Sequence, residues 1–112
     1  MEENILASIK QMIGSEPDYR HFDKEITMAI NSAFAILFQL GVGPQDKPYM
    51  IMDGSETWDE FMDDGQLELV KSYVALKVQT LFDPPTSSFL LSNINEQIKE
   101  FEWRLNVQNE TP

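Results

Sequence analysis

The chain has 112 residues, enough for one hydrophobic core but too few for two that fold independently, so we expect a single domain over residues 1–112. Its 19 acidic and 8 basic side chains give a formal charge of -11, which disfavours tight binding to nucleic acid or to an anionic membrane. The absence of cysteine excludes disulfides and sites that depend on a thiolate.

Two features indicate where the chain is made. Residues 1–4 are acidic where a secretory signal would be positively charged, so we expect no signal peptide. The most apolar stretch, 29–42, is too short to span a bilayer and is interrupted by polar residues. We therefore expect a soluble cytoplasmic protein that does not enter a membrane.

Two helices are predicted before residue 43. The first has apolar residues at helical spacing and a glycine just past its end: Ile5, Leu6, Ile9, Met12, Ile13 and Gly14. The second has a broad apolar face from Phe22 to Phe38 and should be the central helix of the core. Asp23 is its predicted N-cap, and Gly41 followed by Val42 is typical of a Schellman ending.

The helical pattern fails between residues 43 and 56, where Gly43-Pro44 and Lys47-Pro48 interrupt it. Tyr49 to Met52 resembles a short strand that enters a turn, so this segment is either a long ordered loop or a small β-hairpin. Thr57 and Glu60 then have capping-box spacing, which predicts a brief helix through Met62.

The last two helices are predicted from about residue 67 to 82 and from about residue 88 onward, separated by Asp83-Pro84-Pro85. The final helix begins after a serine or threonine cap and has an apolar seam at steps of three and four: Leu91, Ile94, Ile98, Phe101 and Leu105. The predicted fold class is therefore all-α, a small bundle of about four main helices with a central loop or short β-hairpin. Residues from about 107 to 112 should form a flexible tail.

Residues suited to catalysis or metal binding are scarce. His21 is the only histidine, and a surface or capping role suits it. The charged residues between Lys47 and Lys71 are all acidic: Asp53, Glu56, Asp59, Glu60, Asp63, Asp64 and Glu68. They lack the order of a calcium-binding loop, which favours a solvated acidic face. No phosphate loop or nucleophile motif occurs, so we expect no enzyme activity, cofactor or metal.

A second apolar face lies on the final helix. At about 100° per residue, Phe89, Trp103 and Val107 point nearly opposite to the seam. Either the central loop, through Tyr49, Met50 or Trp58, folds over Trp103, or this face meets another protein. An exposed Trp beside an Arg, as in Trp103-Arg104, is typical of interaction hot spots.

Four segments together resemble one family: Gln39-Leu40-Gly41-Val42-Gly43, Trp58-x-x-Phe61, Phe82-Asp83-Pro84-Pro85-Thr86-Ser87-Ser88 and Glu102-Trp103-Arg104-Leu105-Asn106. In this order and spacing they are similar to the head-tail connector proteins of tailed siphophages and prophages, also called head-completion, adaptor or DNA packaging proteins. The resemblance spans about residues 5–107.

The resemblance implies a structural virion protein that forms a ring of about a dozen copies beneath the portal, links capsid to tail and lets DNA pass through its lumen without specific binding. Its expected partners are the portal protein, copies of itself and a stopper or tail-completion protein. Its expected location is the virion neck, with the host cytoplasm as the site of assembly. The resemblance makes Trp103, Arg104, Val107 and the tail candidates for portal contact, and the loop with Tyr49, Met50, Met52 and Trp58 a candidate for contact with a neighbouring subunit or the next ring.

The acidity of the chain is compatible with two functions. A ring with acidic walls would let the genome pass, so we expect a net negative lumen. Alternatively, the chain is an acidic helical regulator or DNA mimic that binds a basic protein. A mimic would carry carboxylates at phosphate-like spacing and would need no second apolar face around Trp103.

Overall fold

A computed structural model describes residues 4–14, 20–52, 54–62, 65–82 and 84–110. Five helices follow in chain order: α1 (Ile5–Met12), α2 (Asp23–Gln39), α3 (Trp58–Phe61), α4 (Leu67–Phe82) and α5 (Ser88–Glu110). The described residues contain no strand, and an isolated antiparallel bridge joins Asn4 to Thr57. The predicted all-α fold with four main helices is confirmed.

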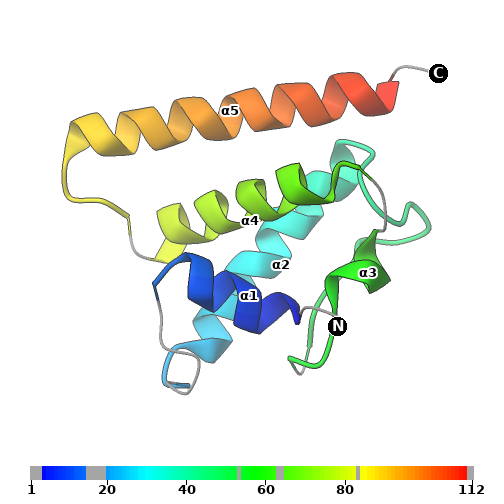
Figure 1. Ribbon diagram of the computed structural model, residues 1–112, viewed down its shortest axis with the longest axis horizontal. Coiled ribbons are helices and arrows are strands. Elements are labelled where there is room, and N and C mark those ends of the chain that lie inside the picture. The colour runs from blue at the N-terminus through cyan, green and yellow to red at the C-terminus, as the bar shows by residue number, and fades with distance from the viewer. Residues whose placement is uncertain (1–3, 15–19, 53, 63–64, 83, 111–112) are drawn as a thin grey trace.

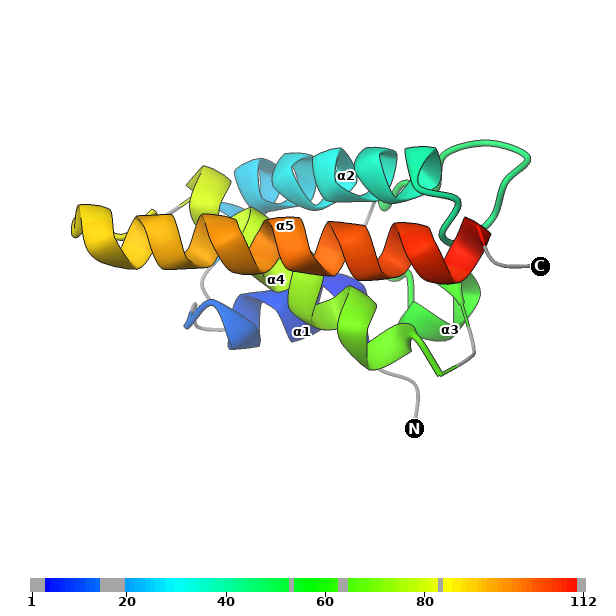
Figure 2. The same cartoon turned by 90° about the horizontal axis from the view of Figure 1, so that it is seen from above.

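Helix α4 lies at the centre of the bundle (Figure 1). It packs against α2, α5 and α1, and α1 also contacts α2. Seen from above, α1 and α2 lie on either side of α4, and α5 runs along it (Figure 2). The longest dimension of the molecule is 42 Å, and α5 lies along it with one side turned away from the bundle.

One hydrophobic cluster joins all five helices. Its largest buried side chains are Trp58, Tyr73 and Phe34, which come from α3, α4 and α2. The ring centroids of Phe34 and Phe61 lie 4.7 Å apart, so the short α3 is fixed to the side of α2. The central helix of the core is α4 by position. Helix α2 buries most of its predicted apolar face, while Phe22 is exposed and Phe38 only half-buried; its buried residues are Ile26, Ala29, Ile30, Ala33, Phe34 and Leu37.

The ends of α2 show one prediction that is wrong and one that is confirmed. Asp23 is the first residue of α2 rather than its N-cap, because its carboxylate accepts a hydrogen bond from Lys10 Nζ at 2.7 Å instead of capping the helix. Phe22 occupies the cap position and provides no side-chain bond. At the other end, the N–H of Val42 bonds the carbonyl of Leu37 at 2.9 Å, as the Schellman motif requires.

The segment between α2 and α3 is a loop, and no hairpin forms among its described residues. The side chain of Asn31 accepts the Ile51 N–H at 2.8 Å and donates to the Ile51 carbonyl at 3.0 Å. These two bonds satisfy the backbone groups that a partner strand would otherwise bind, so an extended segment can lie on α2 without a sheet. Glu60 accepts the Thr57 N–H at 3.0 Å, which confirms the capping box, and α3 ends one residue earlier than predicted.

Helices α4 and α5 follow their predicted boundaries closely. Ser87 Oγ accepts the Leu90 N–H at 3.3 Å and so caps α5. In the seam, Ile98 and Leu105 are buried, and Ile94 and Phe101 pack against the core. The predicted tail is helical as far as Glu110, while 111–112 and Asp83 lie outside the described residues.

Candidate interaction surface

The outer face of α5, defined here by Phe89, Trp103 and Val107, exposes large apolar side chains. Phe89 is 73% exposed and Trp103 is 67% exposed, whereas Leu105 on the inner face is fully buried. The contrast follows from helix geometry, because the seam that packs on α4 turns the opposite side of α5 to solvent (Figure 1).

The central loop does not cover Trp103. Trp58 is 2% exposed inside the core, where its indole N–H donates to Ser8 Oγ at 3.1 Å. Tyr49 is half-buried, and its ring centroid lies 5.3 Å from that of Phe34. Met50 and Trp103 are themselves exposed, so the interpretation in which Tyr49, Met50 or Trp58 covers Trp103 is wrong for this fold.

Arg104 lies next to Trp103 and is held only loosely. Its Nη2 atom is 3.0 Å from Glu100 Oε1, and both side chains are more than half exposed. An exposed pair four residues apart on a helix contributes only about 0.3–0.5 kcal/mol. Arg104 can therefore exchange Glu100 for a carboxylate of another protein at little cost.

A polar contact at Glu102, next to Trp103 in the chain, joins α5 to α4. The Tyr73 hydroxyl donates to Glu102 Oε2 at 2.8 Å, and Lys77 Nζ lies 3.9 Å from the same oxygen. Burial raises the pKa of Tyr73 above its ordinary value, and the hydrogen bond and charge of Glu102 raise it further. Sequence reasoning missed this contact, although a tyrosine on a buried stripe signals that its hydroxyl needs a partner.

The loop candidates separate into buried and exposed residues. Met50 and Met52 are exposed, and Met52 is 85% exposed. Burial, followed by the nearby carboxylates of Glu60 and Glu56, raises the pKa of Tyr49 to about 12. Because Trp58 lies in the core, its suggested role in subunit contact does not fit this conformation.

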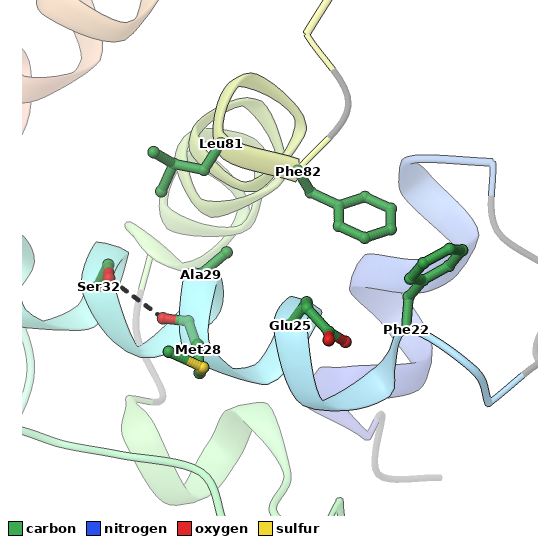
Figure 3. Close-up of a pocket in the computed structure, with 7 residues that line it drawn as sticks. All are labelled: Phe22, Glu25, Met28, Ala29, Ser32, Leu81 and Phe82. Atoms are coloured by element: carbon green, nitrogen blue, oxygen red, sulfur yellow. Dashed lines mark hydrogen bonds between the residues drawn. The ribbon is translucent and has the colours of Figure 1, made fainter.

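An apolar groove, which sequence reasoning missed, lies between the start of α2 and the end of α4 (Figure 3). Its volume is about 450 Å³, and its lining includes Phe22, Glu25, Met28, Ser32, Leu81 and Phe82. The rings of Phe22 and Phe82 meet edge to face with centroids 5.3 Å apart. Leu81, at the end of α4, is 55% exposed here (Figure 3).

The acidic segment serves local structure. In the described part of the chain, no group of three His, Asp or Glu side chains is placed to hold a metal. Glu56 accepts the Met52 N–H at 2.7 Å, Glu60 caps α3, and Glu68 pairs with Lys71 at 3.4 Å. Asp53, Asp63 and Asp64 lie outside the described residues. His21 is exposed, and its ring packs edge to face on Phe22.

Across the described residues, no helix has the length and apolar character needed to cross a membrane.

The sequence model of the phage connector protein family matches residues 5–112, nearly the whole chain. The chain belongs to the phage connector protein family. No curated protein and no solved structure matches this connector.

Membership of this family defines the general role of the connector. Connectors are structural components of phages, so the role implied is not enzymatic and the partners implied are other virion proteins. An exposed apolar surface on a rigid helix is suited to such assembly, since burying it against a partner removes apolar area from water.

Proposed function

We propose that this connector is a head-tail adaptor, which forms a ring beneath the portal, joins the capsid to the tail and surrounds the passage for DNA. The observation that carries the proposal is the exposure of Phe89 and Trp103 on the outer face of α5, in a chain of the connector family. Its expected place is the neck of the virion, after assembly in the host cytoplasm. This role requires neither catalysis nor a cofactor.

The outer face of α5 is the proposed portal contact. Phe89 and Trp103 are four helical turns apart on one side of a single helix, so they form a long, preorganised surface. Burying a large exposed aromatic side chain supplies much of the free energy of a typical hot spot. Arg104 adds a cation at the edge of this surface that can pair with a carboxylate of the portal.

Other surfaces are then left for neighbouring subunits and for the stopper or tail-completion protein. The exposed Met50 and Met52 of the loop are the proposed residues for one of these contacts. The net charge of -11 supports a lumen that repels phosphate and so lets DNA pass without specific binding.

A binding experiment tests the proposal against the alternative of an acidic regulator or DNA mimic. The full chain is immobilised and exposed in parallel to the purified portal protein of the same phage and to a basic nucleic-acid-binding protein at physiological salt. We expect retention of the portal, and a loss of that retention when Trp103→Ala is immobilised instead. Retention of the basic protein alone, unaffected by Trp103→Ala and weakened by salt, would instead support the mimic.

A further inference from the structure

We infer that neighbouring copies of the connector join through the α2–α4 groove of one subunit and the Met50–Met52 segment of the next. This inference rests on the proposed ring, and it names the two surfaces that the ring would bring together. The occupant of the groove is a second copy of this chain.

The groove has the chemistry to accept methionine. Its two aromatic rings, Phe22 and Phe82, stand edge to face at one end, and Met28 and Leu81 supply exposed apolar surface beside them (Figure 3). Thioether sulfur packs favourably at about 5 Å from an aromatic ring, and the flexible side chain adapts to an irregular groove. The Ser32 hydroxyl donates to the Met28 carbonyl at 3.1 Å, so its hydrogen is already bonded when a methionine side chain enters the groove.

The loop presents methionine in an ordered setting. Met50 and Met52 flank the buried Ile51, whose backbone is fixed on α2 by both polar atoms of the Asn31 side chain. Glu56 additionally accepts the Met52 N–H at 2.7 Å. Two exposed methionines on an anchored segment bind a partner with little further loss of backbone entropy.

The two surfaces are different parts of one subunit, and they share no lining residue. The groove is formed by the start of α2 and the end of α4 (Figure 3), whereas the Met50–Met52 segment is anchored through Ile51 on Asn31, at the middle of α2. A ring needs this arrangement, because each subunit must offer two different surfaces to its two neighbours. The contact also leaves the outer face of α5 free for the portal.

Charge complementarity supports the same pairing. Glu25 lines the groove, and Lys47 lies three residues before Met50 in the loop. Within the described residues, neither of these two side chains has an ion-pair partner. Asp46, next to Lys47, opposes the attraction in part, so Lys47 has to approach Glu25 more closely than Asp46 does. In a chain of charge -11, such a local attraction helps to select one contact over others.

Site-specific cross-linking tests the contact directly, because the natural chain has no cysteine. Met28→Cys and Met50→Cys proteins, each with a different affinity tag, are mixed and treated with a short bis-maleimide, both alone at high concentration and with portal particles. We expect a cross-linked dimer that carries both tags. The matched control replaces Met50→Cys by Met12→Cys, another exposed methionine, and should give little product.

Charge reversal provides a second measurement. Glu25→Lys and Lys47→Glu should each reduce the cross-linked yield roughly threefold to tenfold, and the two proteins mixed together should recover it. Lys24→Glu changes the net charge as Lys47→Glu does but lies outside the groove lining, so it should leave the yield nearly unchanged.

The outcomes separate this inference from the proposed function. A ring bound to the portal without the 28–50 cross-link overturns the inference and leaves the adaptor function intact. A specific cross-link in a chain that does not bind the portal supports the contact and contradicts the adaptor function. Absence of the cross-link under both conditions overturns the contact.

Discussion

The two tryptophans of this chain occupy opposite environments, although both were candidates for contact with a partner. Trp103 is 67% exposed on α5, and Trp58 is 2% exposed between α1 and α2 with its N–H bonded to Ser8. Helix geometry alone predicts where Trp103 points, since the seam from Leu91 to Leu105 defines the inner side of α5. The burial of Trp58 could not be predicted in this way, because it depends on how a loop folds back on α2.

The contrast gives a paired prediction. Trp103→Ala should change the free energy of unfolding by no more than about 0.5 kcal/mol but weaken portal binding roughly tenfold or more. Trp58→Ala should lower the free energy of unfolding by about 3–5 kcal/mol, because it leaves a cavity and an unpaired Ser8 hydroxyl. Urea denaturation and a binding titration measure the two effects. Equal losses of stability and binding in Trp103→Ala would show that Trp103 belongs to the core.

The raised pKa of Tyr73 predicts a loss of stability in alkali. The unfolded chain releases tyrosine protons near pH 10, while folded Tyr73 keeps its proton, so the unfolded state binds fewer protons there. Stability is therefore fully present below about pH 10 and falls as pH rises further. Tyr49, with a pKa of about 12, contributes in the same direction.

Tyr73→Phe tests this prediction. It removes the donor to Glu102, so we expect a loss of about 1.5–3 kcal/mol at pH 7, together with a shallower decline between pH 10 and pH 12. Urea midpoints at pH 7 and pH 11 provide the comparison. An unchanged slope in Tyr73→Phe would show that another group causes the alkaline loss.

At the scale of elements, local sequence signals locate the helices well. The range predicted for α4, about 67–82, is the range observed. The Schellman glycine marks the C-terminal end of α2, and the Ser87 cap marks the N-terminal end of α5. These signals work because the bonding groups lie within a few residues of each other. The long-range bonds of Asn31 to Ile51 and of Asp23 to Lys10 gave no such signal. The sequence therefore left the choice between loop and hairpin open, and it placed the N-cap of α2 wrongly at Asp23.

Glycine substitutions test the loop that carries Met50. Gly43 has φ +83, and a Cβ there would lie 2.5 Å from the Phe61 ring, which is itself packed on Phe34. Gly43→Ala should cost about 2–5 kcal/mol of stability, because it adds a clash to left-handed strain. Thermal and urea denaturation measure the loss.

Substitutions at two other glycines separate the cost of the clash from the cost of the left-handed backbone. Gly14 has the same φ of +83 but open space around it, so Gly14→Ala should cost only about 1–2 kcal/mol. Gly65 has open space and no positive φ, so Gly65→Ala should change stability by about 0.5 kcal/mol or less. Similar losses in Gly14→Ala and Gly43→Ala would mean that the Phe61 contact is unimportant.

The arrangement of the whole molecule is what the sequence leaves least determined. The α2–α4 groove joins Phe22 to Phe82, and Trp58 to Ser8 spans fifty positions. Periodicity defines the apolar face of each helix but not the helix that it meets. The all-α class, the inner seam of α5 and its exposed outer face follow from the pattern, whereas the groove and the central position of α4 do not.

Net charge makes a prediction for the assembly. A ring of about twelve copies would carry on the order of 130 negative charges, so subunits repel each other most at low salt. We expect free chains to sediment as monomers at low ionic strength and to join a portal more readily as salt rises to physiological levels. A stable ring formed at low salt without the portal would contradict this account.

Two of the lysines, Lys10 and Lys71, are placed consistently with an acidic lumen. Lys10 is buried against Asp23, and Lys71 is paired with Glu68 and lies 5.8 Å from the centroid of the Trp58 ring. Neither is free to line a channel with uncompensated positive charge. We therefore expect the lumen to be net negative, and a lumen lined mainly by Lys10, Lys24, Lys71 or Lys99 would contradict that expectation.

Cryo-electron microscopy of purified virions tests the central claim most directly. We predict a ring of this chain between the portal and the next neck protein, with Phe89, Trp103 and Val107 of α5 buried against the portal. Virions that lack the chain, or a ring in which the outer face of α5 remains in solvent, would contradict the account.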